Sequence, residues 1–428
     1  MTKSLLYFFI VAAGIFLNTE VAYAEEAVAK IVAADTAWIL IASALVMLMV
    51  PGLALFYGGM DRGKNVLSTL LMSFICLGLI TLQWTLFGYS LAFGEGNKFI
   101  GDFSLFALNG VGLEPNGTIP HQLFMVFQMM FAILTPALIS GAVVGRMKFS
   151  AYAVFVLLWA TLVYDPLCHW VWGGGWLSDL GALDFAGGLV VHISSGVSAL
   201  AACIVLGKRK GFPSAPMPPH SLPLTLLGAG LLWFGWFGFN AGSELAADAT
   251  AASAFVVTQI ATGTALLGWV FTEWIHRGKP TLLGAASGAV AGLVAITPAC
   301  GFVGPISAII IGALAGSICY MAVVAKNMFG YDDSLDVFAV HGIGGTVGAI
   351  CTGLFATAAI GGTDGFFFGN PGQLMIQLKS VAAAWVYSFV VTFIILKAID
   401  MVMGLRVSEE DEVQGLDLSL HGERGYTQ

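Results

Sequence analysis

The chain has 428 residues, of which 58% are hydrophobic and only 10% are charged. A soluble globular domain carries about 25% charged residues, so this chain has too few of them to cover a water-exposed surface. The composition therefore excludes a soluble protein and predicts one that crosses a lipid bilayer many times. The net charge of −8 is thinly spread and gives no sign of nucleic-acid binding.

Residues 1–24 have the pattern of a cleaved secretory signal peptide. A short basic start and an apolar middle lead to Ala22-Tyr23-Ala24, which fits an A-x-A cleavage site. Cleavage there would leave Glu25 as the first residue, on the outer side of the membrane. The alternative is an additional N-terminal span, but the apolar stretch is short for spanning.

Eleven apolar runs follow, and each is long enough to predict a membrane-spanning helix. We expect a membrane domain over residues 25–405, with two five-helix repeats at about 37–206 and 222–358, an eleventh helix at about 375–403, and a tail at 406–428. The expected spans are 37–58, 66–92, 122–144, 150–172, 185–206, 222–240, 252–275, 283–299, 302–325, 337–358 and 375–403.

Lysine and arginine gather in the loops that follow odd-numbered spans, whereas the even-numbered loops hold almost none apart from Lys98. Because basic loops stay on the cytoplasmic side, this alternation predicts an outer N-terminus and a cytoplasmic C-terminal tail. In a bacterium, that means the inner membrane with a periplasmic N-terminus. The basic loops contain Arg62 and Lys64, Arg146 and Lys148, Lys208-Arg209-Lys210, Arg277 and Lys279, Lys326, and Arg406 with Arg424.

Glycines recur at four-residue spacing along several spans, which predicts close helix contacts in one compact bundle. The seams are Gly141-x3-Gly145, Gly284-x3-Gly288-x3-Gly292, Gly312-x3-Gly316 and Gly344-x3-Gly348. The six cysteines lie singly in apolar runs without C-x-x-C spacing, so we expect neither disulfides nor metal ligation by them. No cluster predicts a metal site, a cofactor site or a nucleophile beside its base, so we expect no enzyme.

Two histidines stand in apolar, glycine-rich spans: His192 in the fifth and His341 in the tenth. Because these spans are five apart, they cross the membrane in opposite directions, which is typical of an inverted repeat. Ionisable groups at membrane depth are costly and usually face a cavity or the bundle interior. We expect the two imidazoles to line a narrow path for a small polar species, and either can relay a proton. The alternative is that both merely hold helices together by hydrogen bonds.

Aromatic residues gather where the third, fourth and sixth spans end on the outer side. Trp172 follows the fourth span, Phe127 and Phe131 lie one turn apart in the third, and Trp236, Phe239 and Ser243 belong to the sixth. Such rings normally form an interfacial belt. An inward-turned aromatic cluster with a hydroxyl and no fixed positive charge is instead suited to a small cation, and phenylalanines beyond it would form a dry constriction.

Asp184 opens the fifth span, eight residues before His192. Its carboxylate can cap the helix by accepting backbone N–H bonds, or can supply negative potential to the entrance, and the two roles are compatible. We expect Asp336 to have the corresponding N-terminal role in the tenth span.

The chain resembles the bacterial ammonium transporter (Amt) family of the Amt/Mep/Rh superfamily over residues 35–428. The motifs that carry the resemblance are PGLALFYGG, YSLAFGEGN, VWGGGWLSDLGALDFAGG, GWFGFNAGS, RGKPTLLGAASGAVAGLVAITPACG, DVFAVHGIGG and GLRVSEEDEVQGLDLSLHGERGY. The outer loop at 94–121 does not follow the family motifs.

The resemblance implies an all-α homotrimer of eleven-helix protomers, each with its own pore for ammonium or its analogue methylammonium. Ammonium would be recruited, deprotonated, and carried as ammonia, and the sequence leaves open whether the proton follows by a separate relay. The implied recruitment site consists of Trp172, Phe127 and Ser243, with Asp184 below it; the implied gate is Phe131 and Phe239; the implied pore residues are His192, His341 and Trp236.

The resemblance further implies a cytoplasmic partner, a PII-type signalling protein, and a tail that touches neighbouring subunits. Two other functions stay open at this point. One is an ammonium sensor that uses the same site, and the other is an ion-coupled secondary transporter of a small polar solute, which would need unwound helix ends.

Overall fold

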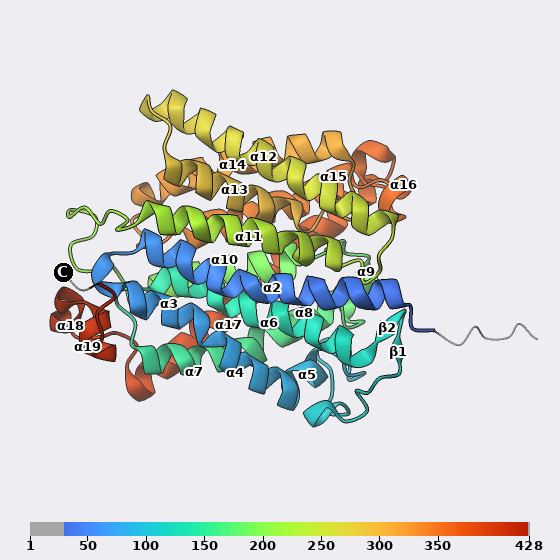
Figure 1. Cartoon of the computed structure of the whole chain (residues 1–428), viewed down its shortest axis with the longest axis horizontal. Helices are drawn as coiled ribbons and strands as arrows, with labels where there is room; N and C mark the ends of the chain where they lie inside the picture. The colour runs from blue at the N-terminus through green and yellow to red at the C-terminus, as the bar shows by residue number, and fades with distance from the viewer. Residues whose placement is uncertain (1–29, 427–428) are drawn as a thin grey trace, which may run out of the picture.

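The computed structural model describes residues 30–426, so the predicted signal peptide at residues 1–24 lies outside the described part of the chain. Long helices run side by side through the molecule (Figure 1). Within residues 33–403, ten helical segments are long and apolar enough to cross a membrane, and the shorter apolar helix α13 accompanies them. The expected fold class, an all-α multi-pass membrane protein with eleven spans, is confirmed.

The first five spans occupy residues 33–206, and the second and fourth are each built from several helical pieces. They are α2 (Ala33–Met60); α3 (Val66–Phe74), α4 (Cys76–Gln83) and α5 (Tyr89–Phe93); α6 (His121–Val143); α7 (Phe149–Trp159), α8 (Asp165–Val171) and α9 (Trp176–Leu180); and α10 (Ser194–Leu206). Two short antiparallel strands, β1 (Pro115–Asn116) and β2 (Ile119–Pro120), precede α6.

The next five spans occupy residues 222–355, and an eleventh follows them. They are α11 (Leu222–Gly242), α12 (Ala249–Arg277), α13 (Leu282–Ile296), α14 (Pro305–Phe329), α15 (Gly344–Phe355) and α17 (Pro371–Met403), with the short α16 (Ala358–Gly361) before α17. Two tail helices end the described chain: α18 (Glu409–Gln414) and α19 (Leu416–His421).

The fifth and tenth spans both begin with a π-helical segment, and each of these segments contains one of the two histidines. The segments are Gly188–Ile193, ahead of α10, and Phe338–Ile343, ahead of α15. π-Helical turns are rare and often occur at functional sites. Their presence at corresponding places in the two halves fits the inverted repeat that the sequence predicts.

Glycines let these helices approach closely, as their spacing predicts. A Cβ added to Gly288 or Gly292 of α13 would collide with α12, and so would one added to Gly316 of α14. The closest approach that matters for the site is between Gly196 of α10 and Gly342, where a Cβ on Gly196 would overlap the backbone of Gly342. Small residues thus bring the two histidine-bearing spans into backbone contact.

Polar side chains fix several helix starts outside the apolar core. Asp248 caps α12 by accepting from the backbone N–H groups of Thr250 (2.9 Å) and Ala251 (3.0 Å). Thr281 caps α13 through Gly284 N–H (2.9 Å). Each cap satisfies donors that the helix itself leaves free, and so sets where the span begins.

The tail folds back onto the loops of the basic end, at the opposite end of the bundle from β1 and β2 (Figure 1). Asp417 accepts from Leu67 N–H (3.1 Å) and Ser68 N–H (2.8 Å), and thereby caps α3. Lys64 Nζ donates to the carbonyls of Glu412 (2.9 Å) and Val413 (2.6 Å). The tail is therefore docked on the first basic loop of its own chain.

Candidate functional site

The two histidines meet at the centre of the bundle. His192 Nδ1 and His341 Nδ1 are 3.2 Å apart, and the rings are stacked with centroids 5.3 Å apart and planes 24° from parallel. Both side chains are buried, and His192 Nε2 has no hydrogen-bond partner within residues 30–426. The two imidazoles, which we expected to line one path, thus lie in direct contact.

This contact fixes how the two rings can share hydrogens. A hydrogen bond between two Nδ1 atoms needs one donor and one acceptor, so one neutral ring carries its hydrogen on Nδ1 and the other carries it on Nε2. The two Nε2 atoms then differ: one is an acceptor and the other a donor. The pair thus offers complementary polar groups inside an apolar surrounding.

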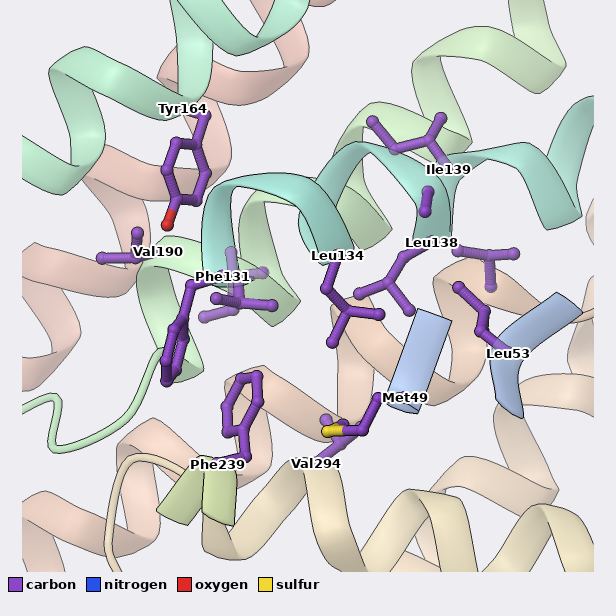
Figure 2. Packing of buried hydrophobic residues seen from close by; sticks show 14 of the residues in the cluster. Met49, Leu53, Phe131, Leu134, Leu138, Ile139, Tyr164, Val190, Phe239 and Val294 are labelled. Atoms are coloured by element: carbon purple, nitrogen blue, oxygen red, sulfur yellow. The ribbon is translucent and has the colours of Figure 1, made fainter. Parts of the chain in front are cut away.

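A row of aromatic rings leads from Trp172, which directly follows α8, to this pair. Trp172 and Phe131 have ring centroids 6.1 Å apart, Phe131 and Phe239 are 4.3 Å apart, and Phe239 and His192 are 6.0 Å apart. Figure 2 shows Phe131 and Phe239 facing each other from different helices, α6 and α11. The expected order of tryptophan, phenylalanine pair and histidine pair is thus present in space.

A cavity of about 300 Å³ lies at the start of this row, and we name it the outer cavity after the orientation that the basic loops predict. No charged side chain lines it, and its polar groups are few. The lining residues are Phe93, Phe124, Gln128, Phe131, Val171, Trp172, Phe185, Ser243 and Leu245. A small cavity with aromatic faces, a hydroxyl and an amide suits a small cation through cation–π attraction and hydrogen bonds.

Trp172 is held in place by the chain segment that leads into the fifth span. Its indole Nε1–H donates to the carbonyl of Asp184 at 2.9 Å. This bond orients the edge of the indole ring. Trp172 and Ser243 both line the cavity. The Ser243 Oγ–H donates to the carbonyl oxygen of Phe239 (2.8 Å). The donors of both side chains are therefore occupied, which leaves the indole face and the Ser243 oxygen for a ligand.

The Asp184 carboxylate caps the π-helical segment that contains His192. Its two oxygens accept from four successive backbone N–H groups: Gly187 (2.8 Å), Gly188, Leu189 (2.7 Å) and Val190 (3.2 Å). Asp184 does not line the outer cavity. Of the two roles that the sequence allowed, the geometry shows the capping contact directly.

The corresponding cap of the tenth span is Asp333, and the expectation that it is Asp336 is wrong. Asp333 Oδ2 accepts from Phe338 N–H (2.8 Å), whereas Asp336 pairs with Lys326 Nζ and has a left-handed backbone (φ 63°). Asp333 precedes His341 by eight residues, the same spacing as Asp184 and His192. Burial raises the pKa of Asp333 to about 6, against the opposing charge of Lys326.

Two further predicted residues lie beside the row of rings rather than on the cavity wall. Phe127 is buried next to Phe131, with ring centroids 5.0 Å apart, but it does not line the cavity. Trp236 stacks on His192 at 5.4 Å, and its Nε1–H donates to Thr297 Oγ1 (2.9 Å). Both residues therefore support rings that face the path.

Sequence reasoning missed five side chains of the cavity wall besides Gln128. They are the apolar residues Phe93, Phe124, Val171, Phe185 and Leu245, and no sequence pattern distinguishes them from core residues. The sequence does distinguish Gln128, because it is the one amide in the apolar run FMVFQMMF, next to Phe127. Its side chain is almost fully buried at the cavity.

Glu244 lies next to Ser243 in the loop between α11 and α12, half-buried at the same end of the molecule. Burial, with Asp248 alongside, raises the pKa of its carboxyl to about 7. Within residues 30–426 there is no group of three or more histidine, cysteine, aspartate or glutamate residues arranged to hold a metal ion.

Known proteins resemble this chain over nearly its whole length. The sequence model of the Ammonium Transporter Family matches residues 37–426. The ammonium transporter of Bacillus subtilis is 54% identical over 398 residues, which cover 92% of this chain and 98% of that protein. The ammonium transporter Amt1 of Archaeoglobus fulgidus is 50% identical over 394 residues, which cover 92% of this chain and 99% of that protein.

Solved structures share the fold as well. The crystal structure of Candida albicans Mep2 superposes with a TM-score of 0.85 at 39% identity, covering 89% of this chain and 88% of that one. A sensor Amt protein superposes with a TM-score of 0.85 at 30% identity, covering 91% of this chain and 98% of that one. The sequence match and the shared fold agree, and the chain belongs to the Ammonium Transporter Family.

Proposed function

We propose that this protein transports ammonium by binding it in the outer cavity, removing a proton, and conducting ammonia past the histidine pair. The observation that supports this most strongly is the continuous row of rings from Trp172 to His341, with neighbouring centroids 4.3–6.1 Å apart. This row begins at an uncharged aromatic cavity and ends at two buried imidazoles.

Recruitment uses the face of Trp172 and the oxygen of Ser243. The indole is held by its bond to Asp184 O, so it needs little reorganisation to receive a cation. The side chain of Gln128 can accept one of the remaining ammonium hydrogens, since it is the amide on the cavity wall. A cation of this size needs no fixed carboxylate in the cavity, because several neutral acceptors and ring faces share its charge.

Deprotonation is required by the constriction beyond the cavity. Phe131 and Phe239 lie 4.3 Å apart between their centroids and leave only apolar surface in the path. Carrying a bare cation through such a region is costly, as for an ionised side chain at the bilayer centre. Ammonia is uncharged and small, so it crosses once the phenylalanine rings move apart.

The histidine pair then supplies polar contacts and a route for the proton. One Nε2 is a donor and the other an acceptor, as the shared Nδ1 hydrogen requires. When a proton is taken up at the accepting Nε2, the shared hydrogen moves from one Nδ1 to the other, and the second ring releases the hydrogen on its Nε2; the net result passes one proton along the pair and exchanges the two roles. We assign His192 and His341 to this relay.

The proposal also covers the location, assembly, partner and domain bounds of the protein. The protein lies in the cell inner membrane with a periplasmic N-terminus, forms a homotrimer, and receives a PII-type protein at its cytoplasmic face. The membrane domain spans residues 25–405 after removal of residues 1–24, and residues 406–428 are a regulatory tail. The supports are the distribution of basic loops and the docking of the tail on the loop that contains Lys64.

A second candidate function is sensing of ammonium. It is favoured by the similarity to a sensor Amt protein, at 30% identity and a TM-score of 0.85. A sensor would use the same outer cavity but would release no substrate into the cytoplasm. Transport assays therefore separate the two functions.

The direct test is uptake of labelled methylammonium into liposomes that contain the purified protein. We expect saturable uptake that unlabelled ammonium inhibits by competition. Uptake no greater than in protein-free liposomes would contradict the transport function, and saturable binding without uptake would favour the sensor.

Replacing Trp172 by leucine should weaken recruitment. Loss of a desolvated cation–π contact costs up to about 2 kcal/mol, and about 1.4 kcal/mol raises the apparent KM tenfold. We expect a rise of about tenfold in KM for methylammonium uptake. Trp172→Phe keeps a ring but loses the bond to Asp184 O, and should fall between wild type and Trp172→Leu. An unchanged saturation curve for Trp172→Leu would contradict recruitment at this ring.

Glu244 should make ammonium uptake depend on outer pH. Because its pKa is raised to about 7, its carboxylate is ionised above that pH and neutral below it. Apparent KM should rise as outer pH falls through 7, by at most about fivefold, since a partly exposed charge contributes below about 1 kcal/mol. Glu244→Gln should show a KM that is flat across this range. The same pH dependence in wild type and Glu244→Gln would show that another group is responsible.

A further inference from the structure

The segment from Gly181 to Asp184 leads into the fifth span without regular secondary structure, so its backbone groups are bound by other elements. Its first two N–H groups donate back to α9. At its other end, Asp184 O accepts from Trp172 Nε1–H (2.9 Å). Between these ends, Gly181 O and both polar backbone groups of Leu183 are bound by the eleventh span, α17.

Gln377 of α17 pairs with the backbone of Leu183 as a neighbouring antiparallel strand would. Its Oε1 accepts from Leu183 N–H (2.8 Å), and its Nε2 donates to Leu183 O (2.8 Å). The same Nε2 also donates to Ala349 O of α15 (3.2 Å). Gln377 is fully buried, and a flipped amide would set donor against donor, so these partners fix one orientation of its side chain.

Two neighbours support this pairing. A Cβ added to Gly353 of α15 would lie 2.8 Å from Gln377 Cγ, so a larger residue there would push Gln377 away. Gln373, one turn earlier on α17, is also buried and donates to Gly181 O (2.9 Å). The eleventh span, which lies outside the two predicted repeats, thus holds the segment at two points.

The contact with Leu183 O acts directly on the backbone of Asp184. Because a peptide bond is planar, this contact fixes the plane that contains Leu183 O and the Asp184 nitrogen. The next carbonyl along the chain is Asp184 O, which orients Trp172. The Asp184 carboxylate is anchored independently by four N–H groups. Loss of Gln377 therefore releases the backbone of Asp184, and with it Trp172, more than the cap of the histidine segment.

We propose that Gln377 and Gln373 are positioning residues for ammonium recruitment, because they hold the segment from Gly181 to Asp184 in the conformation that presents Asp184 O to Trp172. Neither glutamine lines the outer cavity, so both act through this segment rather than on the ligand. The inference rests on the recruitment at Trp172 proposed above, and it assigns a function to the eleventh span.

Replacing Gln377 by leucine should weaken recruitment without slowing the steps that follow. We expect the apparent KM for labelled methylammonium uptake to rise at least about threefold, because a displaced ring loses part of its cation–π attraction. The maximal rate should stay within about twofold of wild type, since the histidine segment keeps its cap. An unchanged KM, or a fall in the maximal rate alone, would overturn the proposal.

A double-mutant cycle tests whether Gln377 acts through Trp172. In the Trp172→Leu background the ring is absent, so adding Gln377→Leu should change the KM by less than about 1.5-fold. A further rise as large as the one in the wild-type background would overturn the assignment.

Two more variants separate positioning from a general loss of stability. Thr392→Val, on the same helix, removes buried bonds to Trp159 Nε1 (3.0 Å) and Ser198 Oγ (2.8 Å), so it should lower stability but keep the wild-type KM. Gln377→Glu, in the uncharged form that burial favours, keeps a donor and an acceptor for Leu183 and should have a KM close to wild type. A KM as high as that of Gln377→Leu in either variant would overturn the proposal.

Gln373→Leu decides the question if Gln377→Leu does not fold, because it leaves only Gly181 O unpaired. It should raise the KM about twofold, as expected for the loss of one modest hydrogen bond. An unchanged KM in this variant would overturn the proposal.

Hydrogen exchange, read by mass spectrometry on the full chain, tests the same contact without transport. Peptides that cover residues 181–186 should exchange at least about fivefold faster in Gln377→Leu than in wild type, because Leu183 N–H loses its acceptor. Equal exchange would overturn the proposal. Wild-type protein that takes up no methylammonium would contradict the transport function, and the exchange comparison would still decide whether α17 holds this segment.

Discussion

Replacing Asp184 by alanine should lower the free energy of unfolding by at least about 4 kcal/mol and abolish methylammonium uptake. The carboxylate accepts from four buried backbone N–H groups, and each donor left without an acceptor costs about 1–3 kcal/mol. The segment that loses these bonds contains His192, and Asp184 O also holds Trp172. Equilibrium denaturation in mixed micelles measures the stability.

Asp184→Asn and Asp333→Ala are the matched controls. Each Asp184 oxygen serves two of the four N–H groups, so asparagine keeps one acceptor and should lose about half as much stability. The Asp333 side chain accepts from Phe338 N–H, and its removal should cost less than Asp184→Ala. Equal stability of wild type and Asp184→Ala would contradict the capping role.

The double substitution His192→Ala/His341→Ala should lower the ammonium-evoked current about 100-fold. Alanine can neither donate nor accept a proton, and positioned acid–base groups typically contribute 100-fold or more. The current is recorded on a solid-supported membrane after an ammonium jump. An unchanged current in the double variant would eliminate the relay.

Trp236→Phe is a control for packing around the pair. It keeps a ring against His192 but removes the bond to Thr297 Oγ1. We expect it to retain most of the current, because the relay depends on the Nδ1 contact between the histidines. A loss as large as in the double variant would mean that packing, not proton transfer, explains the histidine effect.

The histidine pair and the contact between Phe127 and Phe131 could be predicted because they depend on features that a sequence preserves. An ionisable residue in an apolar span has few tolerable places, and two spans of opposite direction bring such residues to the same depth. Phe127 and Phe131 are one helical turn apart, so their contact follows from helix geometry. The glycine seams followed from spacing in the same way.

The capping residue of the tenth span was predicted wrongly. The eight-residue spacing of Asp184 and His192 recurs for Asp333 and His341, but Asp336 is nearer in sequence to the histidine and has the same side chain. The backbone of Asp336 is left-handed, and its carboxylate is paired with Lys326, which a local pattern does not show. The eight-residue spacing to the histidine therefore predicts the capping aspartate better than closeness to the histidine in sequence does.

Other features depend on contacts between distant segments and leave no local signal. The cavity wall includes Phe93 and Phe185, which differ from core phenylalanines only in what lies opposite them. The π-helical start of each histidine span is a rare conformation that the sequence analysis did not predict. The docking of the tail joins residues about 350 positions apart, such as Asp417 and Ser68.

The central claim is that ammonium crosses only after losing a proton, and potassium provides its most direct test. Potassium is a cation of similar size that cannot be deprotonated. Equal concentration jumps of the two ions are applied to membranes with and without the protein. Ammonium should give a current, and potassium should give no more current than protein-free membranes do. The reason is that the contact between Phe131 and Phe239 excludes an intact cation. A potassium current comparable to the ammonium current would contradict the account.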